Sequence, residues 1–200
     1  MNRRAMSAFI RALIIAAAPV LLAGCSAEPA PQPPLAGANI GGEFTLADKT
    51  GKQVRWSQFG GSWRTIYFGY TFCPDACPND MGVLMKGFRL FEKARPDLAA
   101  KVQPLFVTID PARDGPGQVG EFAAAFHPRL IGLTGTAEQV GQAAKAFAIY
   151  YQKGEETSGG YLMDHSRQAY LMDPQGKPVA MLPVDQSPEM VAQELEKWVR

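Results

Sequence analysis

The chain has 200 residues, of which 46% are hydrophobic, enough for one well-packed globular domain. Its formal charge is +1, but without the three N-terminal arginines (Arg3, Arg4 and Arg11) 17 basic residues stand against 19 acidic ones, a net charge of −2. This balance excludes a strongly basic surface, so no nucleic-acid partner is expected. Three cysteines are too few for a scaffold held together by disulfides.

Residues 1–24 have the pattern of a secretory signal peptide. A basic start precedes an apolar run from Ala12 to Ala23, which is too short to span a membrane and contains Pro19. The sequence Leu-Ala-Gly before Cys25 resembles a bacterial lipobox, in which the cysteine is lipidated and becomes the mature N-terminus. The alternative is an ordinary signal peptide that is cleaved nearby. We expect a lipid anchor at Cys25 in a bacterial cell membrane, with the domain facing the oxidising periplasm.

Residues 25–39 are rich in proline and have little to bury. Such a segment is typical of an extended tether that reaches roughly 40 Å at about 3 Å per residue. We expect it to hold a single domain, residues 40–200, away from a membrane surface. That domain starts with two short runs, 41–46 and 53–56, on either side of a DKTGK turn, which predicts an N-terminal β-hairpin.

Two cysteines, Cys73 and Cys77, follow an apolar strand at residues 64–70, and each precedes a proline. The α region is disfavoured before proline, so neither cysteine is expected inside a helix. Pro78 suits the first helical position, which predicts Cys77 as the N-cap of the next helix. The positive end of that helix dipole favours thiolates, the form that redox chemistry and metal binding need.

The spacing of this pair leaves more than one interpretation open. Three residues separate the cysteines, one more than in a thioredoxin-type C-x-x-C motif, and such a loop can close a disulfide or open around a metal ion. A structural disulfide, or two buried thiols, is the plainer alternative. Because a disulfide across so short a loop adds little stability, we favour a functional site.

The rest of the chain alternates between helical and strand patterns. A helix after Pro78 has one apolar face, on which two methionines fit core packing better than copper ligation. Alternating helices and strands with a closing hairpin predict an α/β fold, a thioredoxin-like sandwich with an added N-terminal β-hairpin. The face comprises Met81, Leu84, Met85, Phe88 and Phe91; further strands are expected at 102–109, 130–133, 168–172 and 178–182, and helices at 116–126, 136–149 and after Ser187.

The chain has only two histidines. His165 lies in an expected loop before the strand at 168–172, and in a thioredoxin-like fold this loop returns beside the cysteines. His127, in an expected surface turn, is interpreted as structural. Cys73, Cys77 and His165 together form a soft, low-coordination ligand set that suits copper over magnesium or calcium. Zinc would also accept this set, usually with a fourth ligand or an open position.

Four motifs make the sequence recognisable. They are GYTFCPDACP at 69–78, TIDPARD at 108–114, PRLIGLTGT at 128–136 and DHS at 164–166. The chain resembles the Sco (SenC) family of membrane-anchored copper chaperones for cytochrome c oxidase assembly, over about residues 40–185. Phe72 stands where the family often has a polar residue or histidine, and His127 where aspartate is expected. Neither departure removes a ligand.

The resemblance implies a thioredoxin fold and copper ligation by Cys73, Cys77 and His165. It also implies delivery of copper to the binuclear copper site of oxidase subunit II. Thiolates would hold Cu(I), and the imidazole would complete a site that also accepts Cu(II). Without copper the thiols could form a Cys73–Cys77 disulfide, so loading would require a periplasmic copper donor and prior reduction by a thiol reductant.

Two aspartates are candidates for orienting the metal ligands without binding the metal themselves. Asp164 and Asp110 are expected to orient the histidine or the loop that carries it, although Asp110 is equally suited to capping a turn. Arg113 and Asp114 are expected to form a local ion pair.

Two other functions compete with that of a copper carrier, which is not itself an enzyme. A thiol-disulfide oxidoreductase that reduces the cysteines of the oxidase copper site would need Cys73 and Cys77 but not His165. Reductases of the thioredoxin type carry a cis-proline before the strand facing the cysteines, and residues 164–168 contain no proline, which favours copper. The third possibility is a redox or copper sensor.

Overall fold

The structure, a computed structural model, describes residues 31–156 and 160–200, so the predicted signal peptide and Cys25 lie outside the described residues. Within the described ranges no helix combines the length and the apolarity that crossing a membrane requires. The domain forms one compact unit from Gln32 to Arg200.

A mixed five-stranded sheet lies at the centre of this unit, with the strand order β5-β4-β3-β8-β9. β3, β4 and β5 are parallel, whereas β8 runs antiparallel to β3, and β9 to β8. β3 is the middle strand and is buried along nearly its whole length, as its apolar sequence predicts. The strands are β3 (Trp63–Gly69), β4 (Val102–Thr108), β5 (Ile131–Leu133), β8 (Ala169–Met172) and β9 (Pro178–Leu182).

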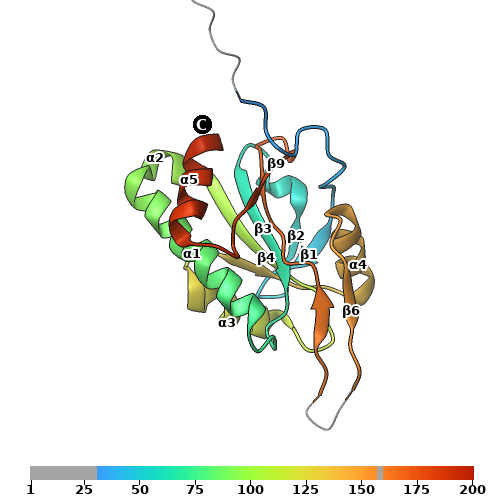
Figure 1. Ribbon diagram of the computed structural model, residues 1–200. Helices are drawn as coiled ribbons and strands as arrows, with labels where there is room; N and C mark the ends of the chain where they lie inside the picture. Colours follow the sequence, from blue (N-terminus) through green and yellow to red (C-terminus); the bar gives the residue numbers. More distant parts are fainter. Residues whose placement is uncertain (1–30, 157–159) are drawn as a thin grey trace, which may run out of the picture. The chain divides into compact units, whose positions relative to one another are not determined.

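Helices cover both faces of the sheet (Figure 1). The crossovers from β3 through α1 to β4 and from β4 through α3 to β5 place α1 and α3 on one face, where α5 packs beside α1. On the other face, Phe147 follows α4 and packs against Phe44 and Trp56. The helices are α1 (Ala76–Ala94), α2 (Pro96–Ala99), α3 (Pro116–Phe126), α4 (Ala137–Ala146), α5 (Pro188–Trp198) and the 3-10 helix η1 (Trp56–Phe59).

The predicted N-terminal hairpin is present as β1 (Thr45–Ala47) and β2 (Gln53–Arg55), and the α/β architecture is confirmed. The apolar face predicted for the first helix is fully buried, including both methionines. A second hairpin, β6 (Tyr151–Lys153) with β7 (Met163–His165), was not predicted. Each of its strands has only three residues, and two of those in β6 are exposed. The sequence therefore shows no alternating apolar pattern that would predict this hairpin.

The tether prediction is wrong for residues 32–39, which belong to the compact unit. The backbone N–H of Leu35 donates a hydrogen bond of 3.1 Å to the Val179 carbonyl, and the Leu35 side chain packs against the core. Proline content alone predicts an extended chain, whereas this one leucine gives the segment apolar surface to bury.

Leu35→Ala in a fragment of residues 32–200 should therefore lower the free energy of unfolding by about 1 kcal/mol, because the half-buried side chain loses its packing. Urea denaturation measures the change. Asn39→Ala, at an exposed position in the same segment, is the control and should leave the midpoint unchanged. Equal stability of the Leu35 variant and the parent would show that the segment does not pack on the domain.

Candidate metal centre

The fold brings the three predicted ligands together. Cys73 lies in the loop after β3, Cys77 in the first turn of α1 and His165 at the end of β7. The two Sγ atoms and a ring nitrogen of His165 all lie within 4.8 Å of one another. The Cys77 Sγ is 3.2 Å from the His165 Nε2, and both thiols are free. The arrangement is a small triangle of two sulfurs and one nitrogen.

Cys77 lies inside the helix, which corrects the sequence-based prediction. α1 begins at Ala76 with Asp75 as N-cap, and the Asp75 side chain makes no capping hydrogen bond. The backbone N–H of Cys77 instead donates to the Cys73 Sγ at 3.3 Å. Proline is tolerated at Pro78 because the first N–H groups of a helix have no intrahelical partner, so the helix starts earlier than the proline rule suggests. The Cys73 sulfur thus caps the helix that carries Cys77.

A glycine at the end of β3 makes room for the buried thiol. A Cβ atom at Gly69 would lie 3.0 Å from the Cys77 Sγ and 2.8 Å from the Tyr67 Cε1. Because real Cβ atoms do not approach other atoms so closely, any larger residue at 69 would displace the sulfur or the tyrosine ring.

His165 is held with one nitrogen facing the sulfurs. The prediction placed it in a loop, but it ends β7, opposite Tyr151 of β6. Its Nδ1 lies 2.7 Å from the Ser166 carbonyl oxygen, which can only accept a hydrogen bond. Nδ1 therefore carries the ring proton, and the lone pair on Nε2 is directed at Cys77. This is the tautomer and orientation that a metal ligand needs.

Two tyrosine rings flank the imidazole. Tyr67 and Tyr70, at the end of β3 and just after it, meet the His165 ring edge-on, with centroid distances of 6.4 and 5.9 Å. The Tyr70 hydroxyl also accepts a hydrogen bond from the Met163 N–H on β7. These contacts join β3 to the short hairpin. Nothing in the spacing of the tyrosines indicated this role, because both also fit a buried strand.

Burial and hydrogen bonding give the two thiols different acidities. For the half-buried Cys73, burial is the largest single influence and opposes ionisation, but hydrogen bonds from the backbone N–H groups of Cys77 and Asp75 contribute to a lowered thiol pKa. Burial raises the pKa of the Cys77 thiol, which is 0% exposed. Burial also lowers the pKa of His165. Of the two thiols, the more exposed Cys73 is therefore the more readily ionised.

The two candidate aspartates have different surroundings. Asp110 is buried and accepts hydrogen bonds from the Tyr161 hydroxyl at 2.9 Å and from the Arg113 Nε at 2.5 Å. The Arg113 NH1 also donates to the Tyr161 carbonyl at 2.9 Å, so the Asp110 side chain contacts the hairpin that ends at His165. Asp164 is exposed; burial lowers the pKa of His165, and the charge of Asp164 acts in the opposite direction.

The predicted ion pair between Arg113 and Asp114 is wrong. Arg113 pairs with Asp110, whereas Asp114 is fully buried and accepts hydrogen bonds from Thr71 and Thr108. Through the Thr71 backbone N–H, Asp114 holds the start of the cysteine loop against the end of β4. Arg113 lies in the turn after β4 and Asp114 directly follows it, so adjacency in the sequence did not place their side chains against each other.

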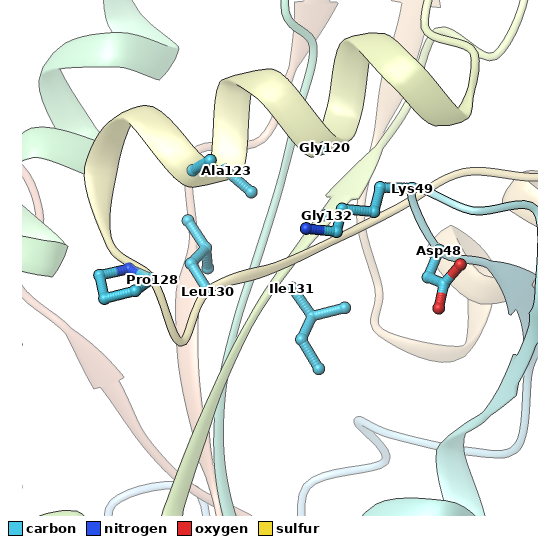
Figure 2. Close-up of a pocket in the computed structure, with 9 residues that line it drawn as sticks. Asp48, Lys49, Gly120, Ala123, Pro128, Leu130, Ile131 and Gly132 are labelled. Carbon is cyan, nitrogen blue, oxygen red and sulfur yellow. The ribbon is translucent and has the colours of Figure 1, made fainter.

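His127 is structural, as predicted, but it is buried rather than in a surface turn. Its Nδ1 accepts from the Arg129 N–H at 3.1 Å, so Nε2 carries the proton and donates to Glu92 at 2.9 Å. A separate hollow between the β1–β2 turn, α3 and β5 is lined by Lys49, Gly120 and Leu130, among others (Figure 2). Its lining includes no thiol or imidazole, so it is no part of the metal centre.

The donor chemistry fits copper. Two sulfurs and one imidazole nitrogen make a soft set of few ligands, and the cleft at the site is open at Cys73 and His165. Cys73, Asp75, Leu162 and Asp164 are among the residues that line this cleft. An ion held here would be within reach of a partner's ligands.

Comparison with known proteins agrees with this geometry. The family model described as SCO1/SenC matches residues 32–200. Protein SCO1 homolog 1, mitochondrial, from Arabidopsis thaliana is 43% identical over 138 residues, covering 69% of this chain and 40% of the relative. The chain spans about half the length of the other mitochondrial relatives that it matches.

Two solved structures are similar over most of the domain. Arabidopsis thaliana ScoI with copper bound is 35% identical with a TM-score of 0.73, and the match covers 79% of this chain and 97% of that one. Bradyrhizobium japonicum ScoI with copper bound is 34% identical with a TM-score of 0.72, over 80% and 99% of the two chains. The predicted thioredoxin-like fold is thereby confirmed. Fold, ligand triangle and sequence match lead to one conclusion: this protein belongs to the SCO1/SenC family.

Proposed function

We propose that this protein is a copper metallochaperone that acts in cytochrome c oxidase assembly. It would bind copper through Cys73, Cys77 and His165 and deliver it to the binuclear copper site of oxidase subunit II. The observation that carries the proposal is the Cys-Cys-His triangle, whose ligand atoms lie within 4.8 Å of one another. Copper-bound structures of similar proteins support the choice of metal.

Each ligand has a distinct part in handling this cargo. The two thiolates suit Cu(I), for which a pair of sulfurs is sufficient, and the imidazole favours Cu(II), which prefers nitrogen and more ligands. Cys73 is half-buried and lies at the open cleft, so its sulfur is the one that an incoming ligand reaches first. Transfer is then an exchange of ligands with the cysteines of the partner, and it needs no deep pocket.

The same sulfurs support a second candidate function, that of a thiol-disulfide oxidoreductase. The lowered pKa of Cys73 makes it the attacking thiolate on a partner's disulfide. Cys77 would then resolve the mixed disulfide, giving up its proton to the His165 Nε2 at 3.2 Å. In the balanced reaction the Cys73 and Cys77 thiols become a disulfide, and the partner's disulfide gains two electrons and two protons. The reverse reaction, with a periplasmic thiol reductant, would prepare the site for copper.

We place the protein at a bacterial cell membrane, anchored through lipid on Cys25, with the domain in the periplasm. Residues 1–24 and the lipobox-like sequence support this location. The proposed ligands are Cys73, Cys77 and His165, so the proposal assigns Cys25 to attachment alone.

His165→Ala separates the two functions. The variant should keep Cu(I) affinity within about ten-fold, because both thiolates remain, yet lose the stable Cu(II) form and its thiolate-to-copper absorption. Cys73→Ser is the matched comparison and should lose tight binding of both ions. Copper titration and visible spectra measure these effects. A His165→Ala variant that still assembled copper-loaded oxidase in cells would favour the reductase over the carrier.

Chemical labelling should distinguish the two cysteines. With the reduced protein and limiting iodoacetamide at neutral pH, Cys73 should be alkylated at least about ten-fold faster than Cys77, because it is more exposed and has the lower pKa. Peptide mass spectrometry measures both rates. Cys73→Ser should leave Cys77 slow to react, and equal rates in the wild type would contradict the asymmetry.

Cys25→Ser should release the protein from the membrane fraction without changing its copper stoichiometry. Cell fractionation and copper analysis of the released protein test the two halves of this prediction. Loss of copper binding would mean that Cys25 belongs to the metal chemistry, and continued membrane attachment would exclude the lipid anchor.

A further inference from the structure

A buried carboxylate lies one helical turn beyond Cys77. Asp80 is 1% exposed, and its side chain is on the same buried face of α1 as Cys77, because residues three apart are neighbours on a helix. The Tyr67 hydroxyl donates to the Asp80 Oδ2 at 2.9 Å. Arg167 donates from Nε to Oδ2 at 2.9 Å and from NH2 to Oδ1 at 2.5 Å, a two-pronged ion pair. We call these three residues the Asp80 network.

The network connects the elements that carry the buried half of the metal centre. Asp80 lies on α1 with Cys77, and Tyr67 lies on β3, where its ring also contacts the His165 ring. Arg167 is in the link between β7 and β8, two residues after His165. One carboxylate is thus bonded both to the residue that flanks the imidazole and to the segment that follows it.

A gain in stability does not by itself explain why the Asp80 carboxylate and its ion pair are buried here. Moving a carboxylate out of water is costly, and a buried ion pair is often no more stabilising than apolar residues of similar size. The pair is also uneven, because the Arg167 side chain is 51% exposed while that of Asp80 is 1% exposed. What a two-pronged pair supplies is geometric precision, since the planar guanidinium fixes both the distance and the angle of the carboxylate.

We propose that Asp80 is a positioning residue of the metal centre, which through Arg167 and Tyr67 holds His165 at liganding distance from Cys77 before copper arrives. The proposal rests on the proposed copper-binding function. It assigns the 3.2 Å separation of Cys77 Sγ and His165 Nε2 to bonds that lie outside the ligand triangle. Cu(II) binding depends most on this placement, because that ion needs the imidazole in addition to the thiolates.

The test uses two variants of the network and a matched control on the same helix. Asp80→Asn keeps the size of the side chain but removes its charge and one hydrogen-bond acceptor. Arg167→Lys keeps the positive charge but cannot form the two-pronged ion pair. Glu92→Gln changes another partly buried carboxylate of α1, which pairs with His127 and Arg129 away from the site. Thermal unfolding is recorded for every variant, so that loss of fold is not mistaken for loss of placement.

A metal-free readout comes from proton NMR of the histidine rings in untagged, reduced protein. The chain has only two histidines, so each serves as a reference for the other. Asp80→Asn and Arg167→Lys should shift or broaden the His165 ring signals and leave those of His127 in place, whereas Glu92→Gln should do the reverse. Wild-type His165 signals in both network variants would overturn the proposal.

The copper readout is the affinity and visible spectrum of the Cu(II) form. Both network variants should bind Cu(II) at least about ten-fold more weakly, with altered thiolate-to-copper absorption, and should hold Cu(I) within a few-fold of the wild type. Lower thermal stability with an unchanged Cu(II) spectrum would show that the network is merely structural. A wild-type protein that bound no copper would instead refute the proposed function, and the metal-free NMR result would still decide the role of Asp80.

Discussion

The metal centre depends on the antiparallel pairing of β3 with β8. In this pairing Tyr67 lies opposite Ala169, so the chain leaves β3 and enters β8 at the same end of the two strands. The cysteine loop follows β3, and the hairpin with His165 precedes β8. Side chains 88 residues apart therefore meet at 3.2 Å. A shift of register by one residue would turn every side chain of β8 to the opposite face and separate the imidazole from the sulfurs.

Pairing alone brings the segments together, and polar contacts then set the angle of each ligand. The Ser166 carbonyl fixes the imidazole tautomer, and the Cys73 sulfur caps the helix that presents Cys77. Asp110 and Arg113, which follow β4, form hydrogen bonds with Tyr161, which precedes β7 in the hairpin. Cys77 and His165 are thus placed on α1 and β7, whereas Cys73 lies in the loop between β3 and α1. Bonds from outside the triangle orient the imidazole and hold the start of that loop, as a selective metal site requires.

The two sulfurs have unequal surroundings, and this inequality fits the proposed role as a copper carrier. The buried Cys77 lies against Gly69 and the tyrosine rings, where its thiol pKa is raised, while Cys73 is at the open cleft with a lowered pKa. One ligand is therefore protected from solvent and the other is available for exchange. A site that must both hold an ion and release it to a partner needs both kinds of ligand.

Much of this protein could be read from the chain itself. The burial of β3, the apolar face of α1, the N-terminal hairpin and the cysteine pair followed from local patterns, because burial and turn chemistry act over a few residues. His165 was predicted as a ligand from the expected topology and the family resemblance. The tertiary structure decided what depends on contacts between distant segments. It placed Leu35 on the domain, put Cys77 inside the helix, made a hairpin of the His165 segment and paired Arg113 with Asp110. It also brought Tyr67 and Arg167 to Asp80, since a buried carboxylate takes whichever partners the packing of the chain supplies.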